Sequence, residues 1–177
     1  MEGGHDTITP YHAVWTMSAL YEMMQAGVNH ALYYHGGSGW PGIFRQPDNT
    51  PTPTYNMYRM LEMLEPAQIA VRSVPGDIGI LASGSSGRIT VLLWQFGTAA
   101  RRVDLSINHE GSFEGTFLYQ HFLIDEEHSN LRSPSQQADL EMTHQERLAE
   151  TASGVIRISV DLPPTSLTLL QFEKAAE

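Results

Sequence analysis

Cysteine is absent from the 177 residues of this sequence. Without it the chain has no disulfide bonds, no thiolate metal ligands and no cysteine nucleophile, and the redox compartment is left open. Basic residues are scarce as well: 10 Lys and Arg stand against 20 Asp and Glu, for a formal net charge of −10. Because a nucleic-acid-binding surface needs clustered Lys and Arg to replace counterions, we expect no nucleic-acid partner.

The sequence also lacks long apolar runs. None approaches the roughly 18 residues of a transmembrane helix. The N-terminal stretch "MEGGHDTITP" contains neither the basic region nor the apolar region of a signal peptide. We therefore expect no membrane partner and a cytoplasmic location. Hydrophobic residues still make up 41% of the chain, which is enough for a packed core.

The first third of the chain predicts a helix, a strand and a second helix. Thr-Pro pairs at residues 9–10 and 52–53 combine a favoured N-cap with a favoured first-turn residue, and Gly27 would end the first helix. Between the helices, "HALYYH" (30–35) is an apolar run typical of a buried strand, and a glycine-rich loop follows it at 36–42. Such a segment looks like the end of a (β/α)8 barrel, most of which is missing.

From residue 69 onward the pattern changes to short β-like runs, most of them bounded by Gly, Pro, Ser or Asn. "ITVLLWQF" (89–96) is apolar on both faces and predicts a central strand, whereas the polar residues 132–153 predict a loop with a short helix. The predicted fold is mixed α and β, with a partial barrel segment at 1–66 and an antiparallel β-sandwich at 67–177. The predicted strands are residues 69–74, 78–83, 88–96, 101–107, 116–124, 155–162 and 166–173.

Histidines prompt a metal hypothesis, because imidazole together with carboxylate suits zinc, copper or iron. None of them forms a tight pair at helical spacing, so we interpret them as scattered surface histidines and expect no metal and no cofactor. A serine hydrolase is not indicated either, because no G-x-S-x-G elbow occurs. The histidines in question are His30, His35, His109, His121, His128 and His144.

The stretch "HFLIDEEHSN" (121–130) places three carboxylates beside an imidazole. Successive side chains on a strand point to opposite faces, so Asp125 and Glu127 would share one face and Glu126 and His128 the other. The four groups would then diverge. The favoured interpretation is a capped turn in which Asp125 or Asn130 binds nearby backbone amides.

"LIDEEHSN", followed by a polar stretch and the closing "DLPPTSLTLLQFE", resembles the C-terminal end of glycoside hydrolase family 39, the β-xylosidases and α-L-iduronidases. The front of the chain is similar in the same order, with "HDT", an aromatic strand, "HGGSG" and the helix "PTPTYNMYRMLEML". The resemblance covers nearly the whole chain. "IDEEHSN" is its most specific part.

The resemblance implies a retaining glycosidase with a (β/α)8 barrel and an appended β-sandwich, acting through two glutamates about 5 Å apart. The acid/base glutamate lies upstream of anything in this chain and cannot be carried over. Glu2 is the candidate nucleophile, standing before "HDT" with Met1 in place of the family's threonine and Gly3 in place of its aromatic residue. The alternative is that Glu2 belongs to a start or tag sequence.

Tyr34, His35 and Trp40 follow the last barrel strand that the resemblance implies, where barrel enzymes place substrate-binding groups. An aromatic side chain there would stack on a sugar ring, and the implied partner is a xylose-type saccharide. The alternative is that the tyrosine packs in the barrel and that Trp40 anchors its loop.

The resulting functional hypothesis is a carbohydrate-active protein resembling a retaining β-xylosidase, in the form of a C-terminal half. Whether this chain alone is an enzyme is left open. Two alternatives are a non-catalytic carbohydrate-binding or structural module, and an oligomeric fragment with a metal-dependent activity at a histidine-containing interface. Since a partial barrel exposes strand edges and apolar helix stripes, we expect a homo-oligomer, a dimer through residues 11–65.

Overall fold

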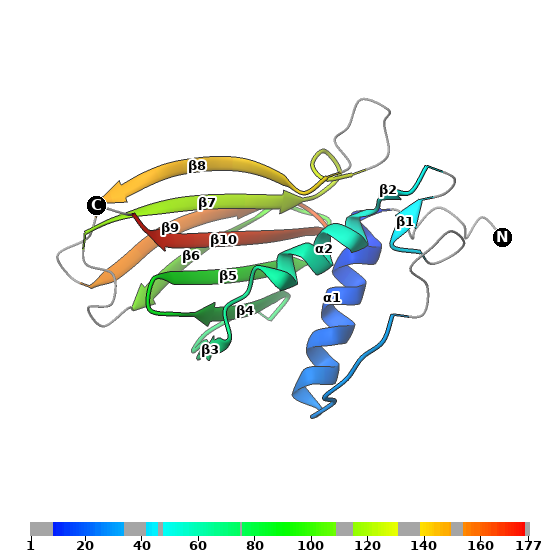
Figure 1. The fold of residues 1–177 in the computed structure, drawn as a ribbon, viewed down its shortest axis with the longest axis horizontal. Coiled ribbons are helices and arrows are strands. Elements are labelled where there is room, and N and C mark those ends of the chain that lie inside the picture. Colours follow the sequence, from blue (N-terminus) through cyan, green and yellow to red (C-terminus); the bar gives the residue numbers. More distant parts are fainter. Residues whose placement is uncertain are drawn as a thin grey trace.

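The computed structural model describes residues 9–33, 42–45, 48–74, 76–108, 115–130, 139–149 and 154–175. Its N-terminal part contains helix α1 (Pro10–Gln25), the hairpin strands β1 (Phe44–Arg45) and β2 (Thr50–Pro51), and helix α2 (Pro53–Glu62). The remainder is built from strands (Figure 1). These are β3 (Ala67–Ile69), β4 (Ile78–Gly84), β5 (Arg88–Gln95), β6 (Arg101–Asn108), β7 (Thr116–Ile124), β8 (Glu141–Ala149), β9 (Val155–Leu162) and β10 (Ser166–Lys174).

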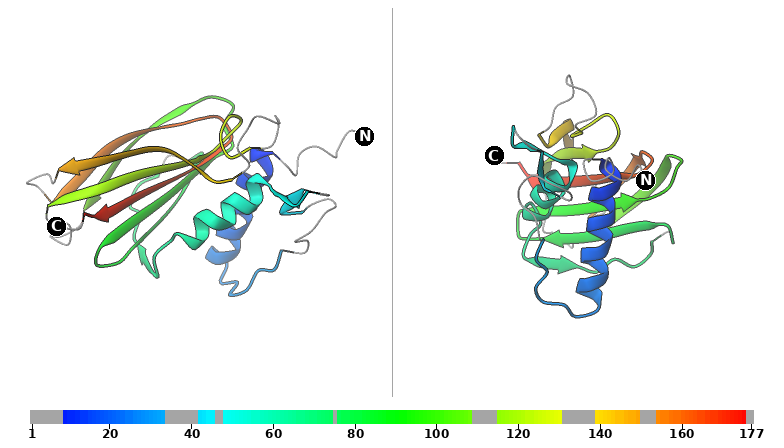
Figure 2. Two further views of the ribbon diagram at one scale, coloured as in Figure 1. Left: turned by 45° about the horizontal axis from the view of Figure 1, so that its top comes forward. Right: turned by 90° about the vertical axis from the view of Figure 1, so that its right-hand side faces the viewer.

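The strands form a large and a small sheet. The large sheet has six antiparallel strands in the order β3-β4-β5-β10-β7-β8, and the small sheet pairs β6 with β9. The small sheet packs on one face of the large sheet, and both helices cover the opposite face near one end (Figures 1 and 2). The predicted class, mixed α and β with an antiparallel sandwich after a helical segment, is confirmed.

Two hydrophobic cores lie on the two faces of the large sheet. Val91 and Leu93 of β5 point into the core between the sheets, whereas Leu92 and Trp94 point into the core beneath the helices. This alternation explains why the four consecutive residues 91–94 of β5 are all apolar, and it confirms the prediction of a central strand. The helices contribute Ala13, Val14, Met17, Met57 and Met60 to the second core.

The ends of the helices follow the predicted signals. Thr9 and Thr52 are the N-cap residues, each followed by proline, and the Thr52 side chain accepts a hydrogen bond from the Tyr55 amide at 3.4 Å. Gly27 lies just beyond α1 with φ +80°, a left-handed conformation that glycine adopts without a steric penalty.

Two predicted strands are wrong or too long. Residues 30–33 form no strand, and the rest of "HALYYH" lies outside the described residues. A short apolar run becomes a strand only where neighbouring strands supply backbone hydrogen-bond partners, and no strand among the described residues pairs with 30–33. In the 69–74 run, only Ile69 belongs to a strand, and residues 70–74 leave the sheet.

The loop with a short helix predicted for residues 132–153 is wrong at 141–149, which form β8. This strand pairs with β7 at the edge of the large sheet, and its side chains are mostly exposed. Its sequence therefore has no need of apolar alternation. Backbone hydrogen bonds to β7 hold this strand in place, and a hydropathy pattern gives no information about them.

The division of the chain into a barrel segment (1–66) and a β-sandwich domain (67–177) stays a prediction. In the structure, the helices on one side of that division and the large sheet on the other share the second core.

Candidate functional site

All four predicted site residues lie outside the described part of the chain. These are the candidate nucleophile Glu2 and the candidate substrate-binding residues Tyr34, His35 and Trp40. Tyr33, the neighbour of two of them in sequence, is described and packs against both helices.

We call the group formed there the His12–Tyr33 cluster; it comprises His12, Trp15, Tyr33, Thr54 and Tyr58. His12 Nδ1 hydrogen bonds to Thr54 Oγ1 at 2.8 Å and so links α1 to α2. The Tyr33 ring meets the His12 ring edge-on with centroids 6.3 Å apart, and the Tyr58 ring edge-on at 5.8 Å. Trp15 stacks on His12 at 6.0 Å and is 53% exposed, so one side of the cluster faces solvent.

Helical periodicity explains why these side chains meet. α1 turns Ala13, Val14 and Met17 toward the sheet, which leaves His12 and Trp15 on another face, three residues apart. On α2, the i, i+4 pair Thr54 and Tyr58 likewise lies along one side of the helix. The two faces meet where the helices pack together.

The titratable groups of the cluster are neutral near pH 7. Burial lowers the pKa of His12, which favours the uncharged imidazole. Burial and the nearby Tyr58 raise the pKa of Tyr33 to about 12, and burial also raises the pKa of Tyr58. Together with the indole of Trp15 and the hydroxyl of Thr54, they form an uncharged surface of aromatic rings and hydrogen-bonding groups.

Tyr33 Oη is buried and has no hydrogen-bond partner among the described residues. A buried hydroxyl without a partner loses about 1–3 kcal/mol relative to one that is satisfied, so a ligand hydroxyl at this position would be favoured. Aromatic rings and uncharged hydrogen-bonding groups are the chemistry on which neutral polyhydroxyl compounds bind. None of its members is a carboxylate, so it cannot by itself supply the acid and base of a glycosidase.

His12, Thr54 and Tyr58 were missed from sequence as site residues. Tyr58 fits the apolar stripe of α2, and His12 and Thr54 are 42 residues apart, so nothing local links them. A usable signal was the placement of histidine, tryptophan and tyrosine next to helix positions that face the core.

No family model matches the sequence, and no curated protein matches it. Solved structures do match. The chain superposes on a family 39 enzyme from Xanthomonas axonopodis pv. citri with a TM-score of 0.76 and 13% identity, covering 99% of this chain and 43% of that one. It superposes on a monomeric β-xylosidase from Caulobacter crescentus CB15 with a TM-score of 0.74 and 11% identity, covering 99% and 44%.

The chain shares its fold with part of the family 39 glycoside hydrolases. The resemblance predicted from "IDEEHSN" and the closing strand is therefore confirmed at the level of the fold. A family 30 endoxylanase from Clostridium papyrosolvens C71 is also similar, with a TM-score of 0.64 and 14% identity over 97% of this chain and 40% of that one. The chain thus spans less than half the length of each of these glycosidases.

"DEEHSN" is a structural turn, as predicted. Asp125 Oδ1 accepts hydrogen bonds from the amides of Glu127 (2.8 Å) and His128 (2.7 Å). The Ser129 hydroxyl donates to the Leu123 carbonyl at 2.7 Å and accepts from the Glu141 amide at 2.9 Å. The turn thereby joins the end of β7 to the start of β8.

The predicted divergence of the side chains is wrong for one pair, Asp125 and His128, whereas Glu126 and Glu127 are exposed. β7 ends at Ile124, so strand alternation stops before the acidic residues begin. The chain then turns back, and His128 Nδ1 comes within 2.9 Å of Asp125 Oδ1. Asn56 of α2 donates from Nδ2 to the Ser129 carbonyl at 3.4 Å, so the turn also docks a helix onto the β-sandwich.

Two negative findings apply to the described ranges. No group of three or more His, Asp or Glu side chains there is arranged to hold a metal ion. No helix among these residues is long and apolar enough to cross a membrane.

Proposed function

We propose that this protein is carbohydrate-active and binds a xylose-type saccharide at the His12–Tyr33 cluster. The observation that carries the proposal is the unpartnered Tyr33 Oη within a neutral, partly exposed aromatic group. Sugars present hydroxyls that would satisfy such a group and C–H faces that pack on aromatic rings. The fold shared with glycoside hydrolases of families 39 and 30 supports this ligand class.

Catalysis requires more than the described residues. We propose O-glycosidic hydrolysis of the retaining type only where a second glutamate, from polypeptide outside these residues, faces Glu2 at about 5 Å. The chain alone would then bind without turnover. Release of nitrophenol from an aryl β-xyloside by wild-type protein, abolished by Glu2→Gln, would show instead that the chain holds a complete catalytic pair.

Binding can be tested with xylobiose by isothermal titration calorimetry. Tyr33→Phe removes the unpartnered hydroxyl and keeps the ring, so we expect affinity to fall about tenfold, the loss of roughly one neutral hydrogen bond. Tyr21→Phe is the matched control, because Tyr21 lies on α1 but packs on Trp94 rather than on the cluster. No saturable heat at millimolar xylobiose would refute the saccharide proposal, and equal affinity of Tyr33→Phe and wild type would refute this location.

We also propose that the chain forms a dimer through residues 11–65. Large apolar side chains are exposed on α1 and the segment that follows: Trp15 (53%), Met24 (41%), Val28 (47%) and Leu32 (96%). Contiguous apolar surface of this kind promotes association. The Caulobacter β-xylosidase is described as monomeric, and this chain covers 44% of it.

Light scattering during size-exclusion chromatography at micromolar concentration should therefore give twice the mass of the 19.7 kDa chain. The double variant Val28→Lys/Leu32→Asp, at two exposed positions outside the His12–Tyr33 cluster, should give the monomer mass. Met142→Glu is the control, because Met142 is also 43% exposed but lies on β8. A monomeric wild type would refute the dimer.

A further inference from the structure

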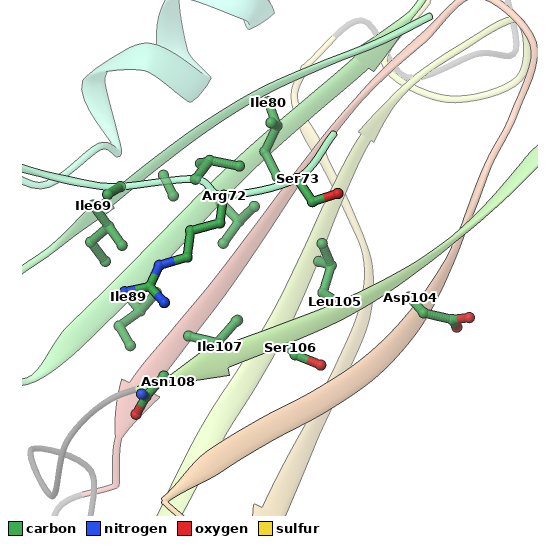
Figure 3. Close-up of a pocket in the computed structure, with 14 residues that line it drawn as sticks. Ile69, Arg72, Ser73, Ile80, Ile89, Asp104, Leu105, Ser106, Ile107 and Asn108 are labelled. Carbon is green, nitrogen blue, oxygen red and sulfur yellow. The ribbon is translucent and has the colours of Figure 1, made fainter. Parts of the chain in front are cut away.

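A cavity of about 560 Å³ lies between the two sheets, along β6 (Figure 3). We call it the β6 slot. Its walls are the apolar side chains of the large sheet, strand β6, and the irregular segment that follows β3. The lining residues are Ile69–Ser73, Ile80, Ala82, Ile89, Val91 and Asp104–Asn108.

The slot exists because the two layers of the sandwich differ in width. Six strands form the large sheet and two form the small one, so part of the inner face of β4 and β5 lies beside the segment that follows β3 rather than directly beneath β6 and β9. Ile80, Leu105 and Ile107 pack against the core between the sheets but are only partly buried. Ala82, Ile89 and Val91 on the floor of the slot are buried, so only the partly buried apolar side chains remain within reach of water, and a further strand beside β6 would cover them.

The backbone of β6 offers the docking edge. Among the described strands, β6 pairs only with β9, so its other side presents amide and carbonyl groups to the slot. An edge of this kind is a template for another extended chain. The four residues Asp104–Ile107 of this edge line the slot, a length of about 14 Å at 3.4 Å per residue.

Arg72 supplies a charge at the slot. Figure 3 shows its guanidinium directed toward the ends of Ile89 and Ile107, while the Asp104 carboxylate points away. Arg72 forms no ion pair with any residue in the described ranges. A guanidinium beside an apolar floor complements a carboxylate carried by an otherwise apolar ligand.

We propose that the β6 slot binds an extended segment of another polypeptide, which adds to the edge of β6, places apolar side chains at alternate positions into the slot, and pairs a carboxylate with Arg72. The free edge favours a peptide over a small amphiphile, because only a peptide satisfies backbone donors and acceptors along a strand. In the solved glycosidases the matched part is less than half of the chain, so this fold occurs there beside further polypeptide.

The probe is the synthetic peptide acetyl-Thr-Val-Thr-Val-Thr-Glu-amide, whose glutamate lies on the same face as its valines, with a glutamine-for-glutamate version for comparison. Hydrogen–deuterium exchange is followed at those amides of Asp104–Ile107 that point away from β9, which belong to alternate residues of the strand. We expect the glutamate peptide at millimolar concentration to slow their exchange at least tenfold. It should also bind several-fold more tightly than the glutamine peptide. Arg72→Gln should abolish this preference between the peptides and leave the unliganded exchange pattern unchanged.

Two substitutions test the location. Ala82→Phe fills the slot from β4 and should eliminate peptide protection, whereas Ala99→Phe, at an exposed position outside the slot, should not. If Ala82→Phe fails to fold, as judged by circular dichroism, Leu105→Glu at the partly buried wall replaces it.

Three results would overturn the proposal. The first is the absence of protection at 104–107 with either peptide. The second is decanoate binding that depends on Arg72 while the peptides do not bind, which would assign the slot to a small amphiphile. The third is protection that rises with protein concentration without peptide, which would assign the β6 edge to a second copy of this chain.

Discussion

Replacing Gly79 with alanine should lower the free energy of unfolding by about 3 kcal/mol, the upper part of the range for overpacking a core. Gly79 of β4 lies directly opposite Trp94 of β5, and the indole covers the glycine. A Cβ atom at Gly79 would lie 1.9 Å from Trp94 Cε2, so the ring has to move. Trp94 is 4% exposed and packs on Tyr21 of α1, so its displacement would disturb the contact between sheet and helix.

Urea unfolding followed by circular dichroism measures this effect, and the transition midpoint should fall by at least about 1 M. Gly87→Ala is the matched control, because a Cβ atom there would have nothing within 4 Å. Its effect should stay within about 0.5 kcal/mol. Equal midpoints for the two variants would show that Trp94 does not depend on the bare backbone at Gly79.

A second large effect is expected from acid, through His121 of β7. Burial, followed by the nearby His144 and His128, lowers the pKa of His121 to about 4, while Asp125 opposes the shift. Its Nε2 is buried without a hydrogen-bond partner in the described part of the chain, and its Nδ1 lies 3.2 Å from Thr143 Oγ1. The folded protein therefore holds this imidazole neutral.

The sign of the pH dependence follows from these pKa values. Below pH 6.5 the unfolded chain takes up a proton at His121 and the folded chain does not, so stability falls as the pH decreases. The loss is complete near pH 4, where the folded form is protonated as well. At 1.36 kcal/mol per pKa unit it amounts to about 3 kcal/mol.

His121→Phe removes the titrating group and keeps a ring in the buried position. Urea unfolding at pH 7 and pH 4.5 should show that wild type loses about 2–3 kcal/mol more than this variant between the two values. His144→Gln, which removes a secondary cause of the shift at an exposed side chain, should retain most of the pH dependence. Parallel pH profiles for wild type and His121→Phe would contradict the prediction.

Both predictions depend on contacts that the sequence does not display. In the sequence, Gly79 is one glycine in a β-like run. Only the structure shows that Trp94 lies opposite it. The sequence places His121 among scattered surface histidines, but in the structure it lies opposite His144 of β8 and its Nε2 atom is buried. In each case the decisive neighbour lies on another strand.

Local signals in the sequence were sufficient for most of the fold. Short β-like runs bounded by Gly, Pro, Ser or Asn identified most of the strands, and the apolar run at 89–96 identified a strand buried on both faces. The threonine–proline pairs marked both helix starts. These features succeed because a side chain's position along a helix or strand alone decides which face it occupies.

Tertiary structure decided the rest. It made β8 from polar residues, because pairing with β7 supplies hydrogen bonds that no hydropathy pattern records. It took residues 70–74 out of the sheet and left the β6 slot beside them. It brought His12 to Thr54 across 42 residues and folded Asp125 back onto His128. Periodicity tells which face of an element is buried, but which elements share that burial depends on contacts between residues far apart in the chain.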